Sequence, residues 1–109
     1  MSKTKIIQLS EFDVTQKIIE SLTNVCTRAV LFSIRDDAKD ATKIAEELSI
    51  SQSTVYKTLS QLEELALIEV SKFIFSGGKK IKMYKSRIAQ VNILIKDTEP
   101  VLELYPNTV

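Results

Sequence analysis

The sequence has no histidine, a single cysteine and only two glycines among its 109 residues. Without histidine, the Ser-His-Asp and Cys-His catalytic arrangements cannot form, and one chain cannot assemble an ordinary zinc site. The glycines are the adjacent pair Gly77 and Gly78, which fits neither a P-loop nor a dinucleotide-binding fingerprint. These absences predict a protein that is not an enzyme and that carries no metal and no cofactor.

Long apolar runs are also missing. The N-terminal apolar run is too short for a signal peptide, and no uninterrupted run approaches the roughly 18 residues of a membrane span. The lone Cys26 cannot form an intramolecular disulfide, which suits a reducing compartment. We therefore expect a cytoplasmic protein without membrane contact, in which Cys26 is a small core residue of a buried helix rather than a redox sensor.

Charge is nearly balanced in total but not along the chain. The net charge is +1, and a neutral total ordinarily argues against a nucleic-acid partner. Residues 71–96, however, hold seven basic side chains and no acidic one. Because a polyanion responds to the local field, this segment is a candidate contact for nucleic acid.

Helical periodicity dominates the first two thirds of the chain. Val14, Ile18, Leu22 and Val25 recur at spacings of four, four and three residues, which predicts a helix over about residues 11–22. The apolar residues between Asn24 and Arg35 are dense enough to predict a mostly buried second helix.

Two further helices are predicted, separated by a tight break. Asp40 is a candidate N-cap for a short helix, and Ser51 is a candidate N-cap for a longer helix that extends to about Leu65. The expected inward side chains are Ile44, Ala45 and Leu48 in the short helix and Val55, Leu59, Leu62 and Leu65 or Ala66 in the long one.

The period then changes to that of strands. Residues 68–75 are rich in β-formers, residues 76–79 supply a turn, and residues 81–84 resume an extended strand, which predicts a hairpin with a basic tip. A second hairpin is predicted from residues 88–96 and 101–105. A helix over residues 88–96 is the alternative, because Ile88, Val91 and Ile95 also fit one helical face.

The order of these elements resembles a known family. Residues 42–68 (TKIAEELSISQSTVYKTLSQLEELALI) and the basic hairpin after them are similar to the winged helix-turn-helix of ArsR-like and MarR-like regulators from prokaryotes and archaea. This resemblance covers residues 28–86. It implies an α+β fold in which a three-helix core carries a β-hairpin wing. We expect one domain over residues 1–109, with an N-terminal extension (1–23), a winged-helix core (24–86) and a C-terminal hairpin extension (87–109).

The resemblance also implies a function, that of a sequence-specific DNA-binding transcriptional regulator. The helix at about residues 51–65 would enter the major groove of double-stranded DNA, and the wing at residues 76–82 would contact the adjacent minor groove or phosphates. Metal-sensing members of the family have cysteine pairs and histidines that this chain lacks, so a metal response is not expected. The candidate DNA-binding residues are Ser51, Gln52, Ser53, Thr54, Tyr56, Lys57, Ser60, Lys79, Lys80 and Lys82, with Lys72, Lys85 and Arg87 as flanking positive charges.

A homodimer is expected, because one recognition helix covers only a few base pairs, whereas two helices about 34 Å apart cover two half-sites. Its interface should come from the first helix or the C-terminal hairpin. The candidate interface residues are Phe12 and Ile19 in the first helix and Ile93, Ile95, Leu102 and Leu104 in the hairpin.

Other functions are compatible with the same fold. The main alternative is a winged-helix protein-interaction module that lacks sequence-specific DNA binding. An architectural DNA-binding protein and a sensor with a small molecule between the first helix and the C-terminal hairpin are two more.

Overall fold

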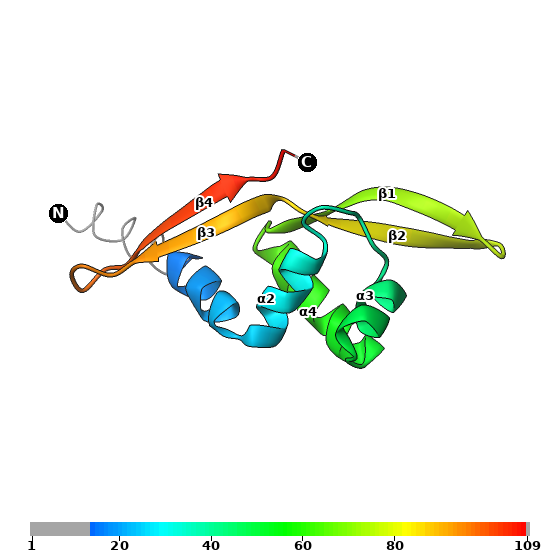
Figure 1. Ribbon diagram of the computed structural model, residues 1–109, viewed down its shortest axis with the longest axis horizontal. Helices are drawn as coiled ribbons and strands as arrows, with labels where there is room; N and C mark the ends of the chain where they lie inside the picture. The colour runs from blue at the N-terminus through cyan, green and yellow to red at the C-terminus, as the bar shows by residue number, and fades with distance from the viewer. Residues whose placement is uncertain (1–13, 109) are drawn as a thin grey trace.

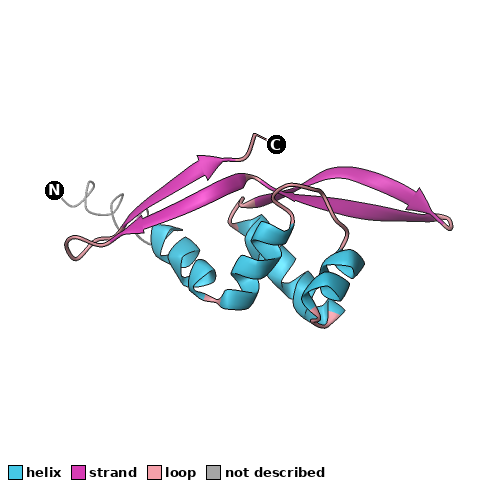
Figure 2. Ribbon diagram, in the orientation of Figure 1, coloured by secondary structure: helices cyan, strands magenta, loops and turns pink. Residues whose placement is uncertain are grey.

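The computed structural model describes residues 14–108, which form helices along one side of two β-hairpins that lie end to end (Figures 1 and 2). Its extents are 58 × 27 × 25 Å. Residues 14–23 are helical, in agreement with the predicted first helix, and residues 11–13 of that prediction lie outside the described residues. None of the helices within residues 14–108 is long and apolar enough to cross a membrane.

Helix α2 spans Val25–Ser33, two residues shorter at its end than predicted. The Asn24 side chain caps it by accepting hydrogen bonds from the backbone N–H groups of Cys26 and Thr27. The helix ends because the fully buried Ile34 turns its carbonyl oxygen to the backbone N–H of Ser86, 2.9 Å away. Val25, which completed the apolar spacing of the predicted first helix, instead occupies the first position of α2, and its side chain is 70% exposed. Cys26 is free and half-buried.

Helices α3 (Ala41–Leu48) and α4 (Gln52–Glu64) form the predicted pair. The side chains of Asp40 and Ser51 cap them as expected, by accepting hydrogen bonds from the backbone N–H groups of Lys43 and Thr54. Ser49 closes the break between them in the left-handed conformation, with φ of 55°. The break is therefore a tight turn that fixes α4 against α3.

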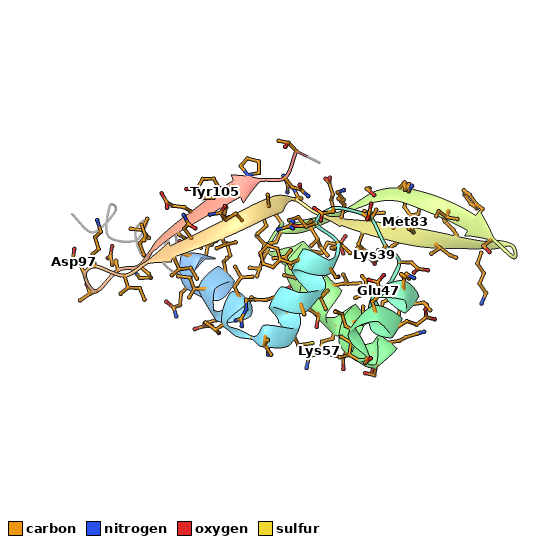
Figure 3. The ribbon with its side chains drawn as sticks, viewed as in Figure 1. Lys39, Glu47, Lys57, Met83, Asp97 and Tyr105 are labelled. Atoms are coloured by element: carbon orange, nitrogen blue, oxygen red, sulfur yellow. The ribbon has the colours of Figure 1, made fainter. Side chains whose placement is uncertain are left out.

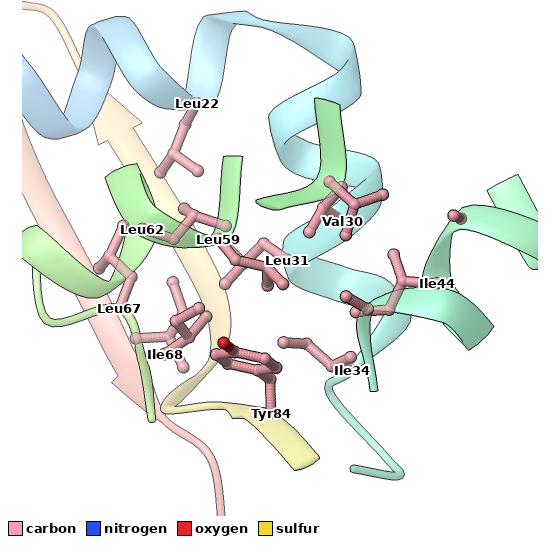
Figure 4. Packing of buried hydrophobic residues seen from close by; sticks show 14 of the residues in the cluster. Leu22, Val30, Leu31, Ile34, Ile44, Leu59, Leu62, Leu67, Ile68 and Tyr84 are labelled. Atoms are coloured by element: carbon pink, nitrogen blue, oxygen red, sulfur yellow. The ribbon is translucent and has the colours of Figure 1, made fainter. Parts of the chain in front are cut away.

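The hydrophobic core lies between α2, α3, α4 and the bases of the hairpins (Figure 4). The predicted inward residues Ile44, Val55, Leu59 and Leu62 are almost fully buried. Burying an aliphatic side chain of this size contributes about 1.5–3 kcal/mol. Ile18, Leu22 and Ile88, from outside residues 24–86, belong to the same cluster.

Strands β1 (Ile68–Ser76) and β2 (Lys79–Ser86) form the predicted hairpin, called the wing from here on. Gly77 and Gly78 make its two-residue turn with φ values of 57° and 75°, which favours glycine over residues with a side chain. At the base of the wing, Lys39 pairs with Tyr84 through two backbone hydrogen bonds of 2.8 and 3.1 Å. The loop between α2 and α3 is thereby joined to β2.

Strands β3 (Ile88–Leu94) and β4 (Val101–Pro106) form the second hairpin, so the strand prediction for residues 88–96 is confirmed over the helix. Only Arg87 separates β2 from β3. The Asn107 side chain ties this junction together by donating to the carbonyl oxygens of Arg35 (2.7 Å) and Ser86 (3.0 Å).

Candidate nucleic-acid interface

The outer face of α4 is polar and free of other elements. The apolar stripe of Val55, Leu59 and Leu62 seats the helix on the core, and Thr58 is buried beside it. On the opposite side the predicted contact residues are all exposed, and Tyr56, with 54% of its surface exposed, stays outside the core. The exposed residues of this face are Gln52, Ser53, Thr54, Tyr56, Lys57 and Ser60.

Side chains at the start of α4 already form hydrogen bonds with neighbouring residues. The Ser51 hydroxyl accepts from the Thr54 backbone N–H at 3.2 Å and donates to the Thr54 Oγ1 at 2.8 Å. The Gln52 Nε2 reaches the Thr42 Oγ1 at 3.4 Å, across the gap between α3 and α4. These bonds fix the two helix N-termini next to each other, where backbone N–H groups carry partial positive charge.

The three predicted wing lysines lie on the outer half of β2 and are exposed. Lys80 and Lys82 alternate with Ile81 and so share one face of the hairpin with Tyr84. The Lys80 Nζ lies 4.1 Å from the centroid of the Phe73 ring, a cation–π contact that orients this lysine.

A hollow of about 540 Å³ separates the wing from the N-terminus of α3 and from Tyr56 of α4. It brings together predicted site residues that are distant in the sequence, Tyr56 on α4 and the three lysines of β2. Lys57 is not part of this group, because it lies at the lower edge of the helices, away from the wing (Figure 3). The lining residues are Asp40, Ala41, Thr42, Tyr56, Lys79, Lys80, Ile81, Lys82 and Tyr84.

The charge in the hollow favours an anion. Three lysines face one carboxylate, that of Asp40, whose oxygen already accepts the Lys43 backbone N–H at 2.9 Å. Tyr84 lines the hollow from the core side, and burial of its ring raises the pKa of its hydroxyl. A phosphate oxygen is the kind of group that the lysines can hold.

An ion-pair cluster on the other side of α3 holds the base of the wing. The Lys39 Nζ donates to the Glu47 Oε2 at 2.7 Å, and the Lys43 Nζ lies 3.8 Å from the Glu47 Oε1 (Figure 3). The hydrogen bond from Lys39 lowers the pKa of Glu47. Because Lys39 also pairs with β2, the cluster ties α3 to the wing.

Two of the flanking charges have structural partners. The Lys85 Nζ donates to the Asp36 carbonyl oxygen at 2.7 Å, and an Arg87 guanidinium nitrogen donates to the Ala66 carbonyl oxygen at 3.2 Å. Both side chains close loops at the base of the wing. Lys72 is exposed on β1, opposite Met83.

Sequence reasoning missed Thr42 and the two exposed phenylalanines of β1, Phe73 and Phe75. Thr42 follows the Asp40 cap by two residues, and this spacing was the available signal for its place at the start of α3. The phenylalanines alternate around Ile74 in a strand that was predicted from its β-forming residues. Their exposure depends on how far the wing extends beyond the helices, which the local pattern does not encode.

Comparison with known proteins gives a family match and a relative that is matched over most of both chains. Residues 28–70 match the family model described as "Bacterial regulatory protein, arsR family". An uncharacterized HTH-type transcriptional regulator of Methanocaldococcus jannaschii, MJ0229, is 29% identical over 91 residues, which are 84% of this chain and 92% of the relative.

The solved structures include a double mutant of Lactococcus lactis ZitR. One structure is 26% identical with a TM-score of 0.48, and covers 58% of this chain and 42% of the ZitR chain. The apo form of the same mutant is 24% identical with a TM-score of 0.48, and covers 74% of this chain and 60% of the ZitR chain. This chain thus spans less than two thirds of the length of either ZitR chain.

Proposed function

We propose that this chain, a winged helix-turn-helix DNA-binding transcriptional regulator that matches the ArsR family over residues 28–70, recognises a specific DNA sequence by inserting α4 into the major groove. The wing then contacts the adjacent minor groove or its phosphates. The observation that carries this proposal is the hollow that Tyr56 of α4 and three wing lysines line together.

The dimensions of DNA suit this arrangement. The major groove is about 12 Å wide and admits one helix, and short side chains such as Ser53 and Thr54 permit close approach to base edges. Gln52 can bind an adenine edge with both ends of its side-chain amide, the carbonyl oxygen accepting and the NH₂ group donating. Phosphates beside the groove would face the hollow, where the lysines supply donors.

The residues proposed to touch DNA are those expected from the sequence, with different roles. Ser51 acts first as the cap of α4, so its hydroxyl would contact DNA only in addition to its bond with Thr54. Lys57 and Ser60 lie farther along α4, beyond the hollow, and would reach the phosphates of the opposite strand.

Selection of bound sequences from a random pool of duplex DNA tests the proposal. Recovery of a defined motif, bound more tightly than random duplex at the same salt concentration, is the expected result. Association that depends on salt alone and has no sequence preference would instead support the alternative, a winged-helix module that binds protein.

We also propose a homodimer that pairs through the second hairpin and the first helix. On one face of the hairpin, Val91 and Leu102 pack against the core, while Ile93 and Leu104 remain 38% and 39% exposed. The core thus covers only the base of this apolar face. A second copy of the chain would cover the exposed outer part of the face. Of the other expected interface residues, Ile95 is exposed and Ile19 is partly buried, and Phe12 lies outside the described residues.

The regulator is proposed to be a single domain over residues 1–109 with a 24–86 core, to act in the cytoplasm and to work without catalysis, metal or cofactor. The absence of histidine and the lone cysteine support metal independence. Within residues 14–108, no three acidic or cysteine side chains come together to hold a metal ion.

A further inference from the structure

The outer part of β1 exposes aromatic side chains that the fold does not use. Phe75 is 75% exposed and Phe73 is 44% exposed. Among the exposed large apolar side chains of residues 14–108, Phe75 has the largest exposed fraction. Exposing an apolar phenylalanine ring to water is unfavourable. Two neighbouring exposed rings therefore indicate a surface that contacts a partner.

Strand register places both rings on the DNA-facing side of the wing. Phe75 lies opposite Lys80 and Phe73 lies opposite Lys82, and directly opposed residues of antiparallel strands share a face. Lys80 and Lys82 line the hollow beside Tyr56. The phenylalanines therefore belong to the same face as the candidate phosphate contacts.

The two rings differ in how much of their surface is free to contact a partner. The Lys80 ammonium covers Phe73 at 4.1 Å from the ring centroid. Phe75 is two residue pairs nearer the tip, next to the Ser76–Lys79 pair that flanks the Gly77–Gly78 turn. Its ring is an exposed apolar group near the tip of the wing, with lysines beside it and across from it. Residues 71–96 contain no acidic side chain that would repel a phosphate.

We propose that Phe75 enters the DNA minor groove as a wedge between adjacent base pairs. The inference rests on the proposed function and adds to it a deformation of the DNA. Apolar side chains inserted in this way partly unstack a base step and kink the duplex by about 20–90°. Lys79, Lys80 and Lys82 would bind the phosphates on both sides of the kink, and flexible pyrimidine–purine steps would be preferred under the wing.

Fluorescence energy transfer across an end-labelled duplex that carries the selected sequence measures the bend. Phe75→Ala should reduce the bend and lower the affinity by about tenfold. It should leave the salt dependence unchanged, since no charge is removed. Phe75→Leu should keep most of the bend, because leucine also acts as a wedge.

Ile74→Ala is the matched control. Ile74 is 42% exposed and neighbours Phe75, but it lies on the opposite face of the wing, beside Ile81 and Met83 in a second hollow of about 580 Å³. This variant should bend DNA like the unmodified protein.

The outcomes separate the wedge from the proposed function. Suppose that the unmodified protein binds a selected sequence. If Phe75→Ala then bends this DNA as much as the unmodified protein does, or if Ile74→Ala reduces the bend as much as Phe75→Ala, the wedge is wrong and sequence-specific binding stands. If the unmodified protein shows no sequence preference, both are wrong. If Phe75→Ala lowers the molar mass of the protein without DNA, the ring is a contact between copies and the wedge is wrong.

Discussion

At the scale of single residues, two side-chain oxygens determine where helices α3 and α4 begin. Asp40 and Ser51 each accept a hydrogen bond from a backbone N–H in the first turn of α3 and α4. These N-termini are joined by Gln52 and Thr42, and that of α3 borders the hollow. The capping residues therefore help to set the geometry of the interface.

Replacing Asp40 with Ala should lower the free energy of unfolding by about 0.5–2 kcal/mol, because α3 then has no side-chain cap. Urea denaturation measures the change. Asp37→Ala, at an exposed residue in the same loop, is the control and should have little effect. Equal decreases in both variants would show that loop charge rather than capping is responsible.

Replacing Gln52 with Ala should change the preferred DNA sequence and cost about 1–3 kcal/mol of binding to the selected site, if the amide binds an adenine edge bidentately. Competition between selected and random duplex measures the change. Gln61→Ala is the control, since Gln61 lies on α4 beside Glu64 and the first helix, away from the wing. The same decrease in affinity on both duplexes would mark Gln52 as a phosphate contact.

At the scale of elements, the wing is long, basic on its outer half and held at its base by the Lys39 pairing with Tyr84. Its lysines are expected to act through charge, whereas α4 is expected to act through the identity of its side chains. The two elements therefore affect binding in ways that can be measured separately.

The double variant Lys79→Ala and Lys80→Ala should weaken binding to all sequences alike. The slope of log affinity against log salt should fall by roughly 0.9 for each phosphate that the wing no longer neutralises. Lys96→Ala removes a positive charge just beyond β3, far from the wing, and should leave the slope unchanged. An unaltered slope in the double variant would show that the wing does not bind phosphates.

The elements themselves were largely predictable, because their signals are local. Caps at Asp40 and Ser51, the apolar period of α4 and the glycine pair of the wing each depend on a few neighbouring residues. The end of α2 was not predictable, since it depends on the distant Ser86 N–H that binds the Ile34 carbonyl oxygen. The hollow was missed for the same reason, because it joins residues 40–42, 56, 79–82 and 84 through tertiary packing.

At the scale of the whole molecule, the faces of the second hairpin are expected to decide whether the protein is a dimer. Ile93→Lys should convert a dimer into monomers, because it places a charge on the partly exposed apolar face. Leu94→Lys is the control, with 43% exposure on the opposite face of the same strand. Light scattering measures the molar mass; a monomeric unmodified protein at micromolar concentration would contradict the dimer.

Removal of divalent metals should leave DNA binding unchanged. The chain has no histidine and one half-buried cysteine, so it lacks the donors of an ordinary transition-metal site. Titration of labelled duplex before and after treatment with a chelator checks this expectation. A decrease in affinity that added zinc reverses would contradict it.

Because only Arg87 separates the two hairpins, the proposed dimer contact and the wing lie at opposite ends of a molecule 58 Å long. In a two-fold dimer joined at the second hairpin, both wings would point outward along the duplex, beyond the two α4 helices. The nuclease footprint would then be wider than the recognised motif, up to roughly 30 base pairs at 3.4 Å per pair. Its outermost base pairs would be selected for how easily they bend rather than for their hydrogen-bonding edges.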